Sequence, residues 1–316
     1  MAVETTAFLN NNADSWFRDI MSDCVLCPRT CHVNRLAGQT GYCGQTAELM
    51  AARASLHYWE EPCISGTSGS GTVFFSGCSL RCVFCQNHNI ALGKAGRVIS
   101  PEHLVEIFLQ LQEQGANNIN LVTPTHFLPQ IVIALEQAKQ QGLRLPIVYN
   151  TSSYEKVDTI KMLEGIVDIY LPDFKYMDSA LAQKYSHAMD YPEIAKAAIA
   201  EMVRQQPEPV FNDETELMEK GVIVRQLLLP GLLEDAKAIV RYLYETYGDS
   251  IYLSLMSQFT PLPNVEGFPE LNRKVTEKEY DEYVDYAIDL GVDKGFIQEG
   301  DIAEESFIPD FDCEGV

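Results

Sequence analysis

Three closely spaced cysteines are the residues of this chain best suited to metal chemistry. Cys78, Cys82 and Cys85 are separated by three and then two residues, and Phe84 stands directly before the last thiol. Because thiolates are soft ligands, three of them at this spacing can hold three irons of a cubane 4Fe–4S cluster. The fourth iron then has no nearby cysteine, and an open coordination site lets a metal centre act on a bound molecule. The alternative is buried structural cysteines or part of a zinc site, although zinc prefers four ligands.

The spacing and the aromatic residue together resemble the signature of the radical S-adenosylmethionine superfamily. Cys78, Cys82, Phe84 and Cys85 match that signature position for position. The resemblance implies that the amino and carboxylate groups of S-adenosylmethionine bind the open iron, with Phe84 beside the cofactor. It also implies reductive cleavage of the cofactor to methionine and a 5′-deoxyadenosyl radical that abstracts a hydrogen atom from a substrate. The electron would come from a reductant such as flavodoxin or ferredoxin.

Polar residues that follow two expected strands are candidates for holding S-adenosylmethionine. Thr123 and Thr125 flank Pro124 where the superfamily usually has Gly-Gly-Glu. Backbone carbonyls at this place can still accept the amino protons of the cofactor. Asn150 and Thr151 end the next strand and offer groups that can bind its ribose or carboxylate. The alternatives are a proline-containing turn at the first place and a helix N-cap at the second.

Three charged residues resemble those of the activating enzymes of glycyl radical enzymes. Asp173 and Lys175 form an Asp-x-Lys pair after the fourth expected strand, and they share one face because side chains alternate along an extended segment. Lys175 can pair with the methionine carboxylate and Asp173 can orient a substrate amide, whereas a surface ion pair is the alternative. Arg225, in an apolar strand followed by Pro-Gly, needs a carboxylate partner because a lone buried charge is costly. That partner is either the cofactor carboxylate or Asp173.

Four more cysteines lie near the start of the chain: Cys24, Cys27, Cys31 and Cys43. Their short gaps and a turn-forming glycine are compatible with a zinc ion or a second 4Fe–4S cluster, and unligated thiols are the third alternative. A complete shell of four thiolates indicates a structural or electron-relay role. Together with Glu60-Glu61-Pro62, this arrangement resembles a subfamily of pyruvate formate-lyase activating enzyme-like proteins, and the likeness covers nearly the whole chain.

The elements that must position these residues alternate between apolar strand-like runs and helix-period segments from about residue 72. Strands are expected at 72–76, 118–122, 146–149, 167–171, 222–229 and 251–257. Helices are expected at 101–114, 128–141, 155–164, 178–205, 233–247 and 276–290. Six strand–helix repeats predict an α/β fold, a partial (β/α)6 TIM-like barrel, which the superfamily resemblance also implies. The cysteine triad follows the first strand, at the end where such barrels carry active sites.

Domain organisation and composition narrow the class of protein. Residues 1–64 are expected to form an N-terminal cysteine-rich extension, and residues 65–316 the barrel with a C-terminal tail. With 23 Lys and Arg against 45 Asp and Glu, the net charge of −22 disfavours nucleic acid as a partner. The chain contains no run of about eighteen apolar residues, so no membrane span is expected, and its first residues do not resemble a secretory signal. Nine cysteines then favour a reducing, cytoplasmic location.

The leading hypothesis is a radical S-adenosylmethionine oxidoreductase that resembles activating enzymes and abstracts hydrogen from a peptide or protein substrate. A small-molecule substrate is one alternative. A non-catalytic iron–sulfur electron carrier is another, although a carrier would normally have four protein ligands for each cluster. Perturbation of the reduced cluster's paramagnetic resonance signal by S-adenosylmethionine would separate the enzyme from the carrier.

Overall fold

One open sheet forms the centre of the molecule. The computed structural model describes residues 15–298 and 309–316, and within them ten strands pair in the order β10-β9-β8-β6-β5-β4-β2-β1-β3, with β7 beside β8. All neighbours from β2 to β10 in this order are parallel, whereas β1 runs antiparallel to β2 and β3, and β7 to β8. The strands are β1 Met50–His57, β2 Ser70–Phe75, β3 Arg97–Val98, β4 Ile119–Val122, β5 Ile147–Thr151, β6 Ile169–Pro172, β7 Val210–Phe211, β8 Met218–Leu227, β9 Tyr252–Met256 and β10 Gly295–Ile297.

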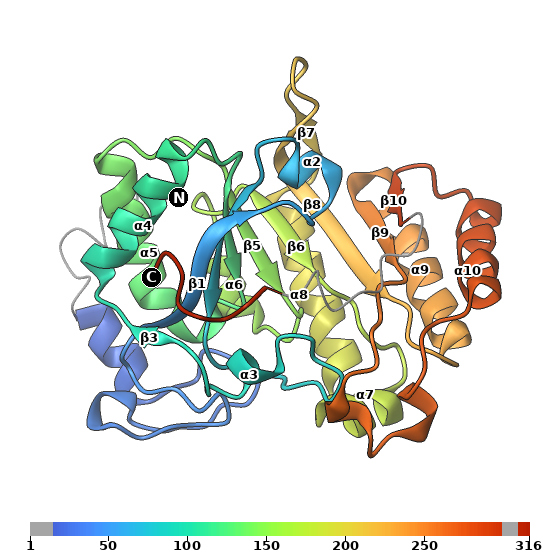
Figure 1. The fold of residues 1–316 in the computed structure, drawn as a ribbon, viewed down its shortest axis with the longest axis horizontal. Helices are drawn as coiled ribbons and strands as arrows, with labels where there is room; N and C mark the ends of the chain where they lie inside the picture. Colours follow the sequence, from blue (N-terminus) through green and yellow to red (C-terminus); the bar gives the residue numbers. More distant parts are fainter. Residues whose placement is uncertain (1–14, 299–308) are drawn as a thin grey trace.

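Helices follow most of the parallel strands and pack their apolar faces on the sheet (Figure 1). In α4, for example, Ser100 caps the first turn by accepting from the His103 N–H at 3.2 Å, and Leu104, Phe108 and Leu111 are buried. The helices are α2 Pro62–Ser65, α3 His88–Ala91, α4 Pro101–Glu113, α5 Leu128–Gln140, α6 Val157–Lys161, α7 Ser179–Ser186, α8 Tyr191–Gln205, α9 Leu233–Tyr247 and α10 Glu277–Leu290. Short 3₁₀ turns lie at Arg35–Ala37, Thr125–Phe127, Gly248–Ser250, Pro263–Val265 and Pro269–Leu271.

The predicted α/β architecture is confirmed. The six expected strands are β2, β4, β5, β6, β8 and β9, and they lie side by side in sequence order as an open parallel sheet. Two predicted helices are wrong in extent: the segment 155–164 contains only the short α6, and the segment 178–205 divides into α7 and α8. His187 ends α7 in a left-handed conformation with φ of 53°, and Pro192 stands in the first turn of α8, where its missing N–H breaks no helical hydrogen bond.

β1 extends the sheet and carries the carboxyl-terminal segment. Residues 50–57, inside the predicted extension, pair with β2, and His57 lies opposite Ser70 at the amino-terminal end of β2. The carboxyl-terminal segment lies along β1 in Figure 1, where the Cys313 N–H donates to the Ala52 carbonyl at 3.0 Å. The division of the chain at residues 64 and 65 stays a prediction. No helix among the described residues is long and apolar enough to cross a membrane.

Candidate active site

The loop that follows β2 brings the cysteine triad to one cavity of about 680 Å³, lined by Cys78, Cys82 and Cys85. Donors within and beside this loop are aimed at two of the sulfurs. The backbone N–H groups of Leu80 and Arg81 donate to Cys78 Sγ at 3.4 and 3.5 Å. Ser186, at the end of α7, donates its hydroxyl to Cys82 Sγ at 2.9 Å. Donors placed in this way favour the thiolate form of a cysteine, which is the form that binds metal.

Burial is the dominant electrostatic influence on the triad thiols. It raises the pKa of Cys82 to about 11 and that of Cys85 to about 12, although Lys175 opposes both increases. Cys85 is held beside Phe84, whose ring is buried against Tyr176 and Phe259 with centroid distances of 6.4 and 6.3 Å. Thiols buried this deeply lose their protons only when a strong positive charge, such as a metal centre, replaces them.

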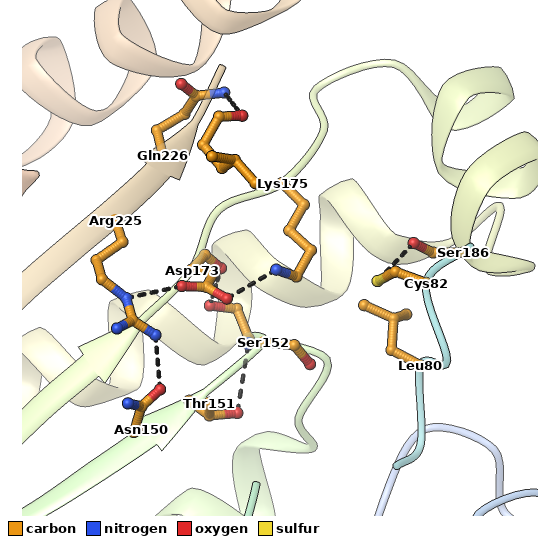
Figure 2. A network of polar contacts seen from close by, with 12 residues as sticks. Leu80, Cys82, Asn150, Thr151, Ser152, Asp173, Lys175, Ser186, Arg225 and Gln226 are labelled. Atoms are coloured by element: carbon orange, nitrogen blue, oxygen red, sulfur yellow. Dashed lines mark hydrogen bonds and ion pairs between the residues drawn. The ribbon is translucent and has the colours of Figure 1, made fainter. Parts of the chain in front are cut away.

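The wall that faces the triad is a connected set of charges built on β5, β6 and β8. Arg225 Nε contacts Asp173 Oδ1 at 2.9 Å, and its two other nitrogens contact Glu60 Oε2 at 3.0 Å and Asn150 Oδ1 at 2.6 Å. Lys175 Nζ contacts the second oxygen of Asp173 at 2.7 Å. In Figure 2 the Lys175 side chain lies between Asp173 and Cys82, with its ammonium group turned toward Asp173. We call Glu60, Asn150, Asp173, Lys175 and Arg225 the charged wall.

The charged wall sets the protonation of its own members. Burial would raise the pKa of Asp173, but Arg225 and Lys175 together outweigh it, so this pKa lies below its usual value. Burial raises the pKa of Glu60 because only one cation, Arg225, opposes it. Asp173 therefore remains an anion that fixes both cations, and Lys175 keeps its ammonium group directed into the cavity.

The remaining predicted cofactor residues lie at the carboxyl ends of β4 and β5. Thr123 lines the cavity and has a φ of 55°, a conformation rare for threonine, while its N–H donates to the Asn150 carbonyl at 2.9 Å. Thr151 also lines the cavity, but its hydroxyl donates to buried Glu155 at 2.5 Å. Thr125 does not line the cavity, and its hydroxyl donates to the same Glu155 oxygen at 2.5 Å.

The four amino-terminal cysteines are in the reduced form and lie in one loop region, and their thiols influence one another: Cys24, Cys27, Cys31 and Cys43. Burial raises the pKa of Cys27 to about 12 and also raises that of Cys43, and neighbouring thiols add to both shifts. The N–H of Tyr42 donates to Cys31 Sγ at 3.3 Å. Gly41 permits this approach, because a Cβ there would lie 2.7 Å from that sulfur.

Arg29 ties this cysteine loop to the triad loop. Its guanidinium donates to the carbonyls of Ser79 at 2.9 Å, His187 at 2.7 Å and Ser186 at 3.2 Å. The same group stacks over the Tyr42 ring at 3.9 Å from the centroid. Two loops that are distant in sequence are therefore held together by one side chain.

The donor sets fit the groups that the sequence predicts. Soft thiols with hydrogen-bond donors aimed at sulfur stand on one side of the cavity, and fixed charges stand on the other. Among residues 15–298 and 309–316, no three Cys, His, Asp or Glu side chains converge on a single point able to hold a metal ion. Binding a cluster or an ion at either cysteine group therefore requires the thiols to turn toward a common centre.

Sequence reasoning missed four residues that shape the site. Glu61 lines the cavity, Glu60 joins the charged wall, Glu155 accepts from two strand-end hydroxyls, and Ser186 donates to Cys82. The adjacent acids before Pro62 were the one available signal, since two carboxylates in a short connection between buried strands are unusual. Nothing in the sequence around Ser186 indicates its contact with a cysteine 104 positions away.

Comparison with known families agrees with this geometry. The family model of the Radical SAM superfamily matches residues 72–212, from within β2 to the end of α8 and the following β7. An uncharacterized protein of Methanocaldococcus jannaschii is 25% identical over 285 residues, which cover 87% of this chain and 77% of that protein. Residues 72–212 are therefore similar to the Radical SAM superfamily, and the cysteine triad and most of the charged wall fall inside or beside this matched segment.

Two solved structures match part of this chain at low sequence identity. Streptococcus suis SuiB bound to S-adenosylmethionine is 15% identical with a TM-score of 0.47, covering 71% of this chain and 48% of that chain. A domain of pyruvate-formate lyase-activating enzyme from Bacteroides vulgatus is 16% identical with a TM-score of 0.39, covering 54% of this chain and 89% of that chain. The chain thus spans about half the length of SuiB.

Proposed function

We propose that this chain is a radical S-adenosylmethionine enzyme whose Cys78, Cys82 and Cys85 hold a 4Fe–4S cluster and whose cavity binds S-adenosylmethionine. When bound, the reduced cluster and the cofactor supply a 5′-deoxyadenosyl radical that abstracts a hydrogen atom from the substrate. The observation that carries this proposal is one cavity with three thiols on one side and a charged wall on the other. The match of residues 72–212 to the superfamily supports it.

Each group of the cavity has a task that its position permits. Lys175, fixed at 2.7 Å from Asp173, presents an ammonium group to a carboxylate that enters between the wall and Cys82. Thr123 and Asn150 offer backbone and amide groups at adjacent strand ends, where they can orient amino and hydroxyl groups of the cofactor. Phe84 and its aromatic neighbours exclude water beside Cys85.

We further propose that the hydrogen comes from a peptide or protein, as in the activating enzymes of glycyl radical enzymes, and that a small molecule is the alternative substrate. Flavodoxin or ferredoxin in a reducing cytoplasm is the proposed source of the electron. The Asp173-Phe174-Lys175 segment and Arg225 support this assignment, because they resemble those of the activating enzymes in sequence and their charged side chains form ion pairs with one another. The acidic chain, with a net charge of −22, disfavours an RNA substrate.

The test is anaerobic reconstitution of the full chain with iron and sulfide, followed by dithionite and S-adenosylmethionine. We expect 5′-deoxyadenosine and a changed paramagnetic resonance signal of the reduced cluster when the cofactor is added. Cys82→Ala should lose iron and product, whereas Cys63→Ala, which changes another buried free cysteine outside the triad, should keep both. Product formation by Cys82→Ala at the unsubstituted level would reject the proposal, and a signal insensitive to the cofactor would favour an electron carrier.

The cysteines near the chain start are proposed to hold either a zinc ion or a second 4Fe–4S cluster: Cys24, Cys27, Cys31 and Cys43. Metal analysis of a variant with all three triad cysteines changed to alanine decides between these alternatives, because the amino-terminal thiols are then the main remaining ligands. About four irons per chain would identify a cluster, and one zinc would identify a structural ion. If the analysis finds neither iron nor zinc, these thiols are unligated and the proposal is rejected.

A further inference from the structure

Two carboxylates close the end of the cavity that lies opposite the cysteine triad. Glu60 and Glu61 belong to the connection between β1 and α2, which leaves β1 at the amino-terminal end of β2, and both line the cavity. Cys78 follows the carboxyl end of β2. Glu60 Oε1 accepts from Nδ2 of Asn120 on β4 at 3.0 Å. We call Glu61, Glu60 (where the charged wall ends) and Asn120, which bonds to Glu60 without lining the cavity, the cavity floor.

The charges around the cavity do not balance. Among the described residues that line it, three carboxylates face two cations, Lys175 and Arg225. Lys175 is taken by Asp173, and Arg225 is shared between Asp173 and Glu60. His57 also lines the cavity, and burial lowers its pKa to about 4, so that imidazole is neutral at pH 7. Glu61 is left as the carboxylate without a cation bonded to it.

Two oxygens of the floor also lack hydrogen-bond donors. Glu61 Oε2 and Asn120 Oδ1 are buried and have no partner among the described residues, and the two side chains are 8% and 0% exposed. Both atoms are acceptors, because the Asn120 amide nitrogen is already used by Glu60. Buried acceptors are nearly always satisfied in native proteins. The floor can therefore accept a hydrogen bond from a donor that carries a positive charge.

We propose that the cavity floor binds a cationic nitrogen of the substrate, the ammonium or guanidinium group of a lysine-like or arginine-like side chain. The inference rests on the proposed function and names the substrate class of the same site. Glu61 lines the cavity and supplies both the counter-charge and an acceptor oxygen that has no donor. Phe74 and Leu227 also line the cavity, and their apolar surfaces suit the methylene stem of such a side chain. Burial raises the pKa of Glu61, and an incoming cation would reverse that penalty by pairing with it.

The test uses four small probes on the anaerobically reconstituted full chain. N-acetyl-lysine and N-acetyl-arginine methylamides carry the cation, whereas the norleucine and glutamate methylamides are the neutral and anionic controls. Calorimetric titration and the shift in thermal midpoint measure binding without any turnover. We expect the two cationic probes to bind at least about tenfold more tightly than norleucine, because a buried carboxylate gains its partner.

Variants assign the effect to the floor. Glu61→Gln should weaken the lysine probe about tenfold or more, since it removes the charge but keeps the shape. Glu61→Asp keeps the charge and should retain most of the binding. Glu113→Gln, at an exposed position of α4, is the matched control and should change nothing. Because probe discrimination is also measured on the unsubstituted chain, a variant that fails to fold does not remove the test.

Three outcomes would overturn the inference. Equal binding of lysine and norleucine probes would show that the floor does not select charge. Stabilisation by sodium or magnesium chloride that displaces the lysine probe would make the floor an inorganic cation site. Loss of S-adenosylmethionine affinity in Glu61→Gln with unchanged lysine binding would assign the carboxylate to the cofactor. Failure to form 5′-deoxyadenosine on the unsubstituted chain would reject the proposed function and leave probe binding as a separate result.

Discussion

Replacing Arg225 by glutamine tests whether one guanidinium holds the charged wall together. Arg225 contacts Asp173 at 2.9 Å, Glu60 at 3.0 Å and Asn150 at 2.6 Å. Removing one partner of a buried ion pair costs about 3–5 kcal/mol, because the remaining charge loses its compensation. Lys175 still covers Asp173 in the variant, so Glu60 is the carboxylate left without a cation. We therefore expect a loss of about 3 kcal/mol, at the low end of that range.

Arg204→Gln on α8 is the matched control. Arg204 also pairs with two carboxylates, Glu201 at 2.8 Å and Glu164 at 3.1 Å, but its side chain is 49% exposed. Exposed ion pairs contribute at most about 1 kcal/mol, because water and salt screen them. Anaerobic urea unfolding of full-length proteins with equal iron content measures both losses, and the difference in midpoints converts to free energy through the common slope.

The pH dependence of the Arg225→Gln loss gives a second readout. Burial already raises the pKa of Glu60, and removing its cation raises it further. The folded variant therefore binds a proton that the unfolded chain releases above about pH 4.3, the ordinary glutamate value. Because the folded state then holds more protons, the variant gains stability as pH falls from 7.5 to 5.5, and the loss shrinks. The double variant Glu60→Gln/Arg225→Gln should recover part of the stability.

If Arg225→Gln lowers the free energy of unfolding no more than Arg204→Gln does, Arg225 does not hold the charged wall together. The reasoning also fails if the double variant is less stable than Arg225→Gln alone, because Glu60 would then not be the stranded charge. An unchanged loss between pH 7.5 and 5.5 would show that no proton is taken up.

Three further substitutions probe other contacts. Burial raises the pKa of Glu155 from 4.5 to about 7, so the folded state binds a proton that the unfolded state releases between these pH values. The free energy of unfolding should therefore fall by roughly 3 kcal/mol as pH rises from 4.5 to about 7, and Glu155→Gln should flatten that fall in thermal melts. Gly315 has a φ of 71°, and a Cβ there would overlap the Ala54 carbonyl, so Gly315→Ala should release the carboxyl-terminal segment and speed its hydrogen exchange. Arg29→Ala removes three carbonyl contacts, including Ser79, and should speed exchange in both cysteine loops while Arg144→Ala leaves them unchanged.

The main strands were predictable because each is an apolar run bounded by polar or glycine residues. β1 escaped prediction because its sequence, Met-Ala-Ala-Arg-Ala-Ser-Leu-His, is rich in alanine and has no β-branched residue. β10 has three residues and gives no periodic signal. The break between α7 and α8 depends on a left-handed His187, a conformation that sequence rarely announces for a residue other than glycine.

The candidate site was partly predictable for a geometric reason. The carboxyl ends of parallel strands meet at one edge of a sheet, which is why Asp173 was one of the two partners expected for Arg225, and the two side chains are in contact. The bond from Arg225 to Asn150 was not predicted. Contacts that cross the cavity were not predictable. Glu60 reaches Arg225 across 165 positions from a connection whose path depends on the antiparallel pairing of β1.

The cavity has a cation near the triad and a carboxylate at the floor, so its two ends differ in charge. Near the triad, Asp173 fixes Lys175, whose charge opposes the rise in the pKa of Cys82 that burial causes, so this cation needs no reorganisation when a ligand arrives. At the floor, Glu61 keeps an acceptor without a donor. Bound ligands that together carry an anionic group at one end and a cationic group at the other are therefore favoured in one orientation. The reverse orientation is disfavoured because it creates two like-charge contacts. The ion pairs between Glu60, Arg225 and Asp173 join these two ends through the wall, so the orientation is built into the strands themselves.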